Sequence, residues 1–223
     1  INTIHAPRIS LRHGILMDIE DEIFNLPRKE DLVQDIINSV WHIANKYNID
    51  ENHCKLVQDI ALSIFDQLKN LHKLGSRERL YLKVASILHD VGKYVCINDH
   101  SENSYDIVRK QNIVGFSHKD IDIIANIIKY HEKEIPDYSH GSYIKLTKEE
   151  RITVSKLVAI FKIAEALDIS HNQKVKEVSI VKEKEELIFK IKHKDEILLE
   201  TWDFNRKASF FGELMGVEPK IRE

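Results

Sequence analysis

Up to about residue 173, the apolar residues of the chain recur at helical spacing. Between residues 32 and 47 they follow the helical period, and the same period returns in later segments that polar residues separate. Ser117 with Asp120, and Thr147 with Glu150, have the form of helix N-terminal caps. The pattern predicts helices over residues 26–47, 51–72, 77–89, 101–110, 117–131 and 147–168.

The period changes after residue 173, where apolar and polar positions alternate and β-branched residues gather. This pattern predicts strands over residues 175–181, 187–193 and 197–202. A short helix is expected over residues 204–215 and a last strand over residues 216–221. The expected fold is mainly α, with an all-α bundle over residues 26–173 and a small α+β unit over residues 174–223.

Composition narrows the class of protein without choosing a function. Hydrophobic residues make up 43% and charged residues 31% of the 223, so the chain can bury a core and keep a polar surface. Basic and acidic residues number 33 and 36, and this balance argues against a general nucleic-acid binder. Two cysteines, no apolar run of ~20 residues and no signal peptide predict a cytoplasmic setting without a membrane span.

One short motif carries the densest set of reactive side chains. His89 and Asp90 are adjacent at the predicted end of a helix, where an imidazole and a carboxylate can bind the same divalent cation. Gly92 allows a tight backbone turn after them, and Lys93 can reach a phosphate oxygen. The motif therefore predicts a metal site beside a phosphate-binding group.

Two residues elsewhere have the type and position to complete such a site. His53 shares a helical face with Val57, Ile60 and Ile64, so its ring is expected to point inward. Asp168 lies in line with the apolar face of its own predicted helix. Because an inward carboxylate is costly to bury without a partner, a cation is a natural one, and a salt bridge or a cap is the alternative.

His100 and His131 stand at the ends of predicted helical segments. Each could ligate a second metal ion, and each has an equally good interpretation as an ordinary histidine. Mixed nitrogen and oxygen ligation suits Mn, Fe, Co, Ni or Zn, and Mg where carboxylates and water dominate. Seven other histidines are interpreted as surface or satisfied core residues: His5, His13, His42, His72, His118, His140 and His193.

The order of His53, His89-Asp90 and Asp168 resembles the metal-binding pattern of the HD phosphohydrolase superfamily. More closely, the chain resembles the C-terminal half of the exopolyphosphatase / guanosine pentaphosphate phosphatase (Ppx/GppA) family. The stretches that carry this resemblance are residues 11–16, 87–93, 100–105, 124–131 and 163–171, with Trp202 and Phe211-Gly212.

The resemblance implies an HD-like region of an enzyme that hydrolyses phosphoric anhydrides. Residues 1–25 would link this region to an N-terminal catalytic half, whose Gly-rich phosphate loops do not occur in the sequence. Lys93 would clamp phosphate, and His131 or His171 would donate a proton. The implied ligands of a divalent metal are His53, His89, Asp90, Asp168, His100 and His131.

The implied partners are polyphosphate or a guanosine pentaphosphate-type substrate and a second copy in a homodimer, without a membrane or a specific nucleic acid. Three functions stay open: a polyphosphate-binding region that retains a metal site, an autonomous metal-dependent HD phosphohydrolase, and a non-catalytic dimerisation and polyanion-binding module. Basic residues could line a polyanion channel, although a solvated helical face is the more ordinary interpretation. These residues are Lys129, Lys133, Arg151, Lys156, Lys162 and Lys174.

Overall fold

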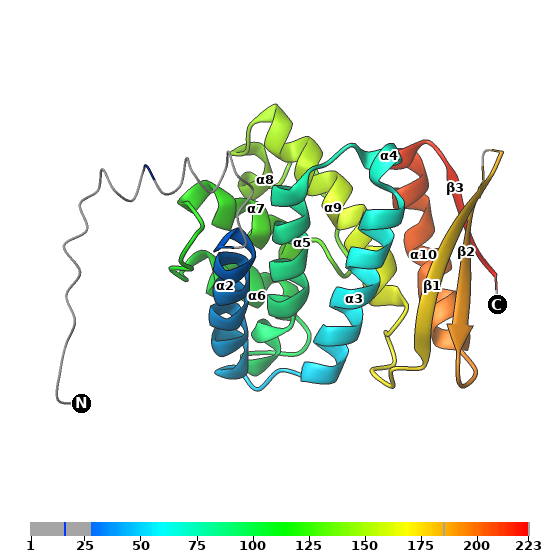
Figure 1. The fold of residues 1–223 in the computed structure, drawn as a ribbon, viewed down its shortest axis with the longest axis horizontal. Helices are drawn as coiled ribbons and strands as arrows, with labels where there is room; N and C mark the ends of the chain where they lie inside the picture. The colour runs from blue at the N-terminus through cyan, green and yellow to red at the C-terminus, as the bar shows by residue number, and fades with distance from the viewer. Residues whose placement is uncertain (1–15, 17–27, 185, 223) are drawn as a thin grey trace.

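The computed structural model describes residue 16, residues 28–184 and residues 186–222. Its mainly α fold with a small sheet at one end confirms the predicted fold class (Figure 1). The predicted linker over residues 1–25 lies, apart from Leu16, outside the described residues. The elements are α2 (Arg28–Asn45), α3 (Glu51–Gln67), α4 (Lys69–His72), α5 (Ser76–Leu88), the 3-10 helix η1 (Val91–Tyr94), α6 (His100–Arg109), α7 (His118–Lys129), α8 (Gly141–Ile144), α9 (Lys148–Ala166), β1 (Val175–Glu183), β2 (Glu186–His193), α10 (Leu198–Met215) and β3 (Glu218–Arg222).

Helix α9 forms the centre of the bundle. Every side chain from Leu157 to Leu167 is buried, and α3, α5, α7 and α10 pack around the helix. A helix that is buried on all sides belongs to a core rather than to a surface. Its buried positions include the charged Lys162 and Glu165, which therefore need partners inside the protein.

The helix starts predicted from capping residues are confirmed. Ser117 and Asp120 form a capping box at the start of α7. Thr147 and Glu150 form the same arrangement at the start of α9. In each box the side chains satisfy backbone N–H groups that have no partner within the helix, so the two boundaries are well defined.

One predicted helix is divided in the structure. The apolar stripe over residues 51–72 belongs to α3 and α4, which meet at Leu68, and Lys73 ends α4 in the left-handed region with φ of 58°. The division places the buried ring of His72 with Nε2 2.8 Å from the carbonyl oxygen of Phe65. His72 is therefore a satisfied core histidine, as expected.

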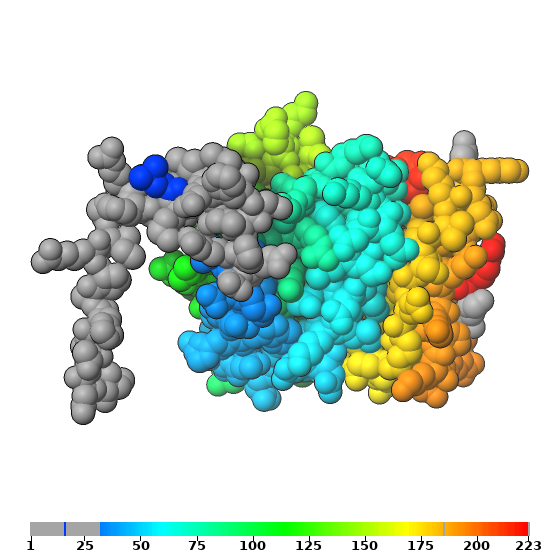
Figure 2. Space-filling view, in the orientation of Figure 1, coloured from blue at the N-terminus to red at the C-terminus, as the bar shows by residue number. Residues whose placement is uncertain are grey.

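A three-stranded sheet with the order β1-β2-β3 closes one end of the bundle. Strands β1 and β2 form an antiparallel pair, and β3 returns parallel to β2 after α10. Gln67 of α3 ties this sheet to the bundle, since its side chain donates to the carbonyl of Val178 at 2.9 Å and accepts from the backbone N–H of Ile180 at 2.8 Å. Figure 2 shows β1 lying along α3 on the surface.

The strand predicted over residues 197–202 is wrong, because this segment belongs to the start of α10. Its buried positions are Ile197, Glu200 and Phe204, which follow a helical period, while Leu198 and Trp202 are exposed. Glu200 holds the inward face through a hydrogen bond from Ser170. A buried carboxylate among exposed apolar residues conceals the helical pattern in the sequence.

The bundle and the sheet region are in direct contact. Helix α10 packs on α9, and β1 packs on α3. The predicted boundary between residues 173 and 174 stays a prediction. In the described part of the chain, no helix has both the length and the apolar character needed to span a membrane.

Candidate metal centre

Four histidines and one aspartate, from four segments of the chain, meet inside the bundle. His53 lies in the first turn of α3, His89 and Asp90 follow α5, His100 opens α6, and His131 follows α7. All five residues are buried, the most exposed being His100 at 8%. Buried polar groups require partners, so the contacts among these five side chains show what each of them can bind.

Gly92 allows the segment after Asp90 to pack against α6. A β-carbon at Gly92 would lie 2.1 Å from the carbonyl oxygen of His100, so no other residue fits there. Ser104 joins the two segments, because its hydroxyl donates to the carbonyl of His89 at 2.5 Å and accepts from the N–H of Gly92 at 2.7 Å. The glycine therefore permits a close approach of two backbones, and its φ is not positive as a tight turn would need.

The first candidate ligand group consists of His53, His89 and Asp90. The Nε2 atoms of His53 and His89 are 3.2 Å apart. The carboxylate oxygens of Asp90 lie 3.9 Å from Nε2 of His53 and 3.6 Å from Nε2 of His89. These atoms are mutually close enough to bind one cation.

The second candidate ligand group consists of Asp90, His100 and His131. The Nε2 atoms of His100 and His131 are 3.2 Å apart, and Nε2 of His100 is 3.7 Å from Oδ1 of Asp90. Asp90 therefore belongs to both groups, and its two oxygens can serve neighbouring cations.

Hydrogen bonds on the far side of each ring determine which nitrogen carries the proton. In His89, His100 and His131, Nδ1 lies 2.9, 2.9 and 2.6 Å from the backbone carbonyls of Ser86, Ile97 and Ile128. A carbonyl only accepts, so each Nδ1 must be the donor. Burial lowers the pKa of His89 to about 4 and the pKa of His131 well below its ordinary value, so both rings are neutral near pH 7.

The Nε2 atoms of each pair face each other, and those of the neutral His89 and His131 are acceptors. His53 donates from Nδ1 to Asp168 at 2.8 Å, and its Nε2 is turned toward His89. Two unprotonated Nε2 atoms 3.2 Å apart would repel each other through their lone pairs. Coordination to a metal ion at about 2.0–2.1 Å removes this repulsion, and a hydrogen bond from Nδ1 to a carbonyl or carboxylate is the usual support of a metal-binding histidine. The donor set fits a divalent cation.

Asp90 is ionised in this environment. Burial raises the pKa of its carboxyl, but the nearby His89 and Lys93 outweigh burial and hold that pKa below its usual range. Lys93 Nζ lies 2.7 Å from Oδ2 of Asp90 and is one-third exposed, so it reaches from the buried groups toward the solvent. The negative charge of Asp90 is balanced at present by this ammonium group.

Asp168 lies beside the two groups and belongs to neither. Its Oδ2 accepts from His53 Nδ1, and its Oδ1 accepts from the N–H of Gln173 at 2.8 Å. In this arrangement Asp168 orients His53 from behind. Its predicted role as a metal ligand stays a prediction.

His171 stands at the exposed edge of the set. Its ring stacks on His53 with 3.6 Å between centroids, and its Nε2 lies 3.3 Å from Nζ of Lys93. Nδ1 of His171 contacts Oδ2 of Asp50 at 3.1 Å. The predicted pair of Lys93 and His171 is thus brought together next to His53.

Sequence reasoning missed three residues that support the set. Asp50 caps α3 and holds His171, and Gln173 holds Asp168. Glu132 has its carboxylate 3.7 Å from Nδ1 of His100. Only Asp50 had a signal in the sequence, because an Asp before a helical apolar stripe is a cap signature.

The basic residues considered for a polyanion channel have partners of their own. Lys129 pairs with Glu102 at 2.7 Å, Lys156 donates to the carbonyl of His72 at 2.7 Å, and Lys174 donates to the carbonyl of Glu196 at 2.8 Å. Arg151 bonds the carbonyls of Ile144 and Leu146, and Lys162 is buried. Lys133 has one weak pairing, with Glu132 at 3.5 Å.

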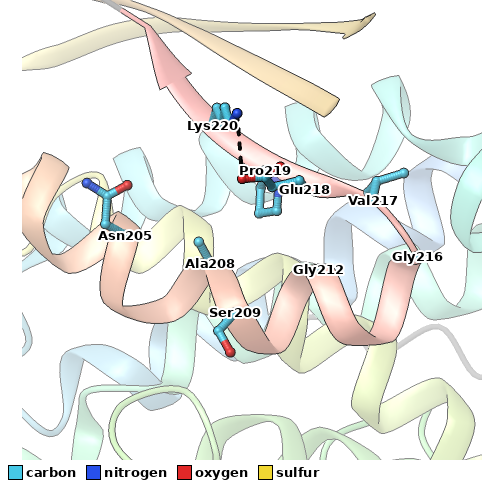
Figure 3. Close-up of a pocket in the computed structure, with 9 residues that line it drawn as sticks. All are labelled: Asn205, Ala208, Ser209, Gly212, Gly216, Val217, Glu218, Pro219 and Lys220. Carbon is cyan, nitrogen blue, oxygen red and sulfur yellow. Dashed lines mark ion pairs between the residues drawn. The ribbon is translucent and has the colours of Figure 1, made fainter. Parts of the chain in front are cut away.

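A cavity elsewhere among the described residues contains none of the candidate ligands. It has a volume of about 780 Å³ and lies between α10 and β3, where Gly212 lets the strand approach the helix (Figure 3). Residues such as Asn205, Ser209 and Pro219 line it. The buried His/Asp set is therefore the stronger candidate for chemistry, on the nature of its side chains.

A family model described as Ppx/GppA phosphatase, domain III, matches residues 37–207. The match covers more than half of the chain and includes all six predicted metal ligands, from His53 to Asp168. The resemblance carried by the motifs around His89, His100, His131 and Asp168 is confirmed by it. The chain belongs to the Ppx/GppA phosphatase family.

Proposed function

We propose that this chain is the HD-like region of a phosphoric anhydride hydrolase in which the His/Asp set holds two divalent metal ions and takes part in catalysis. The observation that carries the proposal is the pair of opposed Nε2 contacts, His53 with His89 and His100 with His131, each at 3.2 Å. Asp90 stands between the two pairs. Family membership supports the hydrolase class.

The residues present indicate which metals would be held. Each group offers two imidazole nitrogens and the shared carboxylate of Asp90. This donor set favours a first-row transition metal such as Fe, Mn or Zn over Mg, which prefers oxygen ligands. A bound divalent ion would neutralise phosphoryl charge and lower the pKa of a water molecule.

Lys93 and His171 supply the remaining groups that phosphate hydrolysis needs. The ammonium of Lys93 is one-third exposed next to Asp90, so it can bind a phosphoryl oxygen that approaches the set. His171 is about one-third exposed and held by Asp50, so its ring can give a proton to the leaving oxygen. Both residues stand on the solvent side of the buried ligands, where a substrate would arrive.

Polyphosphate and a guanosine pentaphosphate-type nucleotide are the proposed substrates, and a homodimer the proposed assembly. The channel predicted for a polyanion has weak support, because most of its candidate cations are engaged within the chain. A short anionic group that reaches Lys93 fits the described surface better than a long groove of free cations.

The test compares metal content with phosphate release. Purified chain is loaded with Mn, Fe(II), Zn or Mg, metal is counted, and release is measured from polyphosphate, guanosine pentaphosphate, a phosphomonoester and a phosphodiester. We expect two transition-metal ions per chain and turnover that His89→Gln abolishes. His72→Gln, which alters a buried histidine outside the set, should leave both intact.

Each other outcome has a distinct meaning. Two bound metals without turnover of any substrate would overturn a catalytic role and favour the non-catalytic polyanion-binding module. The absence of metal after every loading would overturn the metal site itself. Equal losses in the two variants would show general unfolding.

A further inference from the structure

Lys162 is a buried cation on α9 with an unusual set of partners. Its side chain is 3% exposed, and no ion pair between described residues includes it. Instead, Nζ donates to three backbone carbonyls, those of Tyr130 at 3.0 Å, Glu132 at 2.7 Å and Glu134 at 2.9 Å. All three donor positions of the ammonium group are thereby used on one short segment of chain.

That segment carries a candidate ligand. Residues 130–134 follow α7 and form bends without regular secondary structure, and they include His131. The carbonyls that Lys162 binds alternate along the segment on both sides of His131. Glu132, which faces Nδ1 of His100, belongs to the same segment. One ammonium group therefore holds the backbone segment from which the side chains of His131 and Glu132 project.

The charge is a costly way to fill this position. Burial, together with the nearby Lys207, lowers the pKa of Lys162 to about 7, which reports the penalty on the charged form. An apolar side chain of similar length would fill the volume without that penalty, but it would leave three carbonyls unpaired. Lys162 thus carries a desolvation penalty, and in return its ammonium group fixes the backbone beside His131.

Lys156 provides an internal comparison on the same helix. Its Nζ donates to a single carbonyl, that of His72, at 2.7 Å. His72 belongs to neither candidate ligand group. The two lysines therefore share a helix and a bond type, and they differ in whether the bonded segment bears a ligand.

We propose that Lys162 is a positioning residue for the second metal group, which orders residues 130–134 so that Nε2 of His131 faces His100 and Asp90. The proposal rests on the metal centre of the proposed function and adds to it a residue outside the ligand set. It predicts that loss of the ammonium group weakens the group of Asp90, His100 and His131 and spares the group of His53, His89 and Asp90.

The experiment uses the full chain with Lys162→Met, Lys162→Arg and the matched control Lys156→Met. Hydrogen exchange of the metal-free proteins is followed in peptides that cover residues 129–137. We expect faster exchange there in K162M only, because the three carbonyl contacts are lost. Arginine has five donors and can bond several carbonyls, so K162R should restore protection.

Titration with Mn or Zn then measures the two affinities. The expected result is two tight ions in the unaltered chain and in K156M, and one tight ion with a second weakened about 10–100-fold in K162M, as for other residues that orient a ligand. K162R should recover most of the second affinity. If K162M does not fold, Lys162→Gln, whose amide keeps two donors, replaces it with a smaller expected loss.

Two results overturn the positioning role alone. One is unchanged exchange at residues 129–137 in K162M, and the other is faster exchange with both affinities preserved. Equal weakening of both metal groups in K162M and K156M would also overturn it, since that pattern reports general destabilisation. Failure of the unaltered chain to bind metal would remove the proposed function together with this inference, and it is recognised before any variant is compared.

Discussion

Two buried polar clusters of this molecule differ in how their side chains are partnered. The cluster of Glu165, Asp203 and Lys207 joins α9 to α10, and each of its charges faces an opposite charge. The His/Asp set has four imidazole rings around Asp90, with their Nε2 atoms in opposed pairs. Opposite charges pair within the first cluster, whereas the second presents a donor set that fits a cation. Buried nitrogens that face other nitrogens of the same type therefore point to a binding site, whereas buried charges that face opposite charges do not.

Asp90→Asn should have the largest effect on the second cluster. Because Asp90 belongs to both ligand groups, the change should remove both metal ions and reduce activity by at least ~10³-fold, more than the 10–100-fold of an orienting residue. Metal analysis and phosphate release measure the effect. Asp122→Asn, which alters an exposed ion pair with Arg109, should keep two metals. Retention of metal by D90N would remove Asp90 from the ligand set.

Lys207→Met tests the self-satisfied cluster. The change leaves Glu165 and Asp203 as buried carboxylates without their ammonium partner, so the free energy of unfolding should fall by about 3–5 kcal/mol in urea denaturation. Arg206→Met removes a half-exposed partner of Asp203 and should cost less than about 1 kcal/mol. Similar losses in the two variants would mean that burial does not distinguish them.

Substitutions of Asp168 distinguish a residue that orients a ligand from one that binds the metal itself. Asp168→Ala should weaken metal binding about 10–100-fold, since His53 loses the acceptor for its Nδ1–H. Asp168→Asn should lose clearly less, because its amide oxygen still accepts that hydrogen bond. Calorimetric titration with Mn gives the affinities. Equal weakening in both variants would favour direct ligation by the carboxylate.

The partly exposed carboxyl of Asp120 provides a third case, with a smaller expected effect than the two buried clusters. Burial raises the pKa of Asp120, but hydrogen bonds from Tyr81, Ser117 and Arg77 outweigh burial and lower that pKa to about 2. A carboxyl whose pKa is lower in the folded protein adds stability above its ordinary pKa near 3.8, and this is lost as the pH falls toward 2.

Asp120→Asn should therefore reduce the free energy of unfolding by about 1–2 kcal/mol at pH 6. The difference from the unaltered chain should shrink by pH 3, because below pH 3.8 the carboxyl of the unfolded chain takes up a proton that the folded protein does not yet bind. Urea denaturation at the two pH values checks both the size and the sign. A difference that grows on acidification would contradict the assigned pKa direction.

The sequence predicted the parts of the site that depend on helical faces. His53 was placed inward from the apolar stripe of its helix, and His89 with Asp90 from their position at a helix end. The spacing gives a face and not an atom, so it could not distinguish a carboxylate that ligates from one that bonds the rear nitrogen of His53, as Asp168 does. The opposed Nε2 atoms depend on contacts between residues far apart in the chain, which no local pattern contains.

The same limit explains the wrong strand at residues 197–202. There the inward residue is Glu200, whose partners Ser170 and Lys174 come from the loop after α9. Polar residues on buried faces make a helix look irregular to a hydrophobicity pattern. The capping boxes at Ser117 and Thr147 were predictable, because their partners lie three residues away.

If the candidate ligands hold a cation, their spread along the chain would link the metal supply to the stability of the folded protein. A cation held by residues from His53 to His131 would close large chain loops, so it would act as a removable cross-link of the folded state. At a free metal concentration of a hundred times Kd, one such ion adds about 2.7 kcal/mol to the free energy of unfolding. A cell short of that metal would then hold more unfolded chain for its proteases, and the abundance of the protein would report the metal supply.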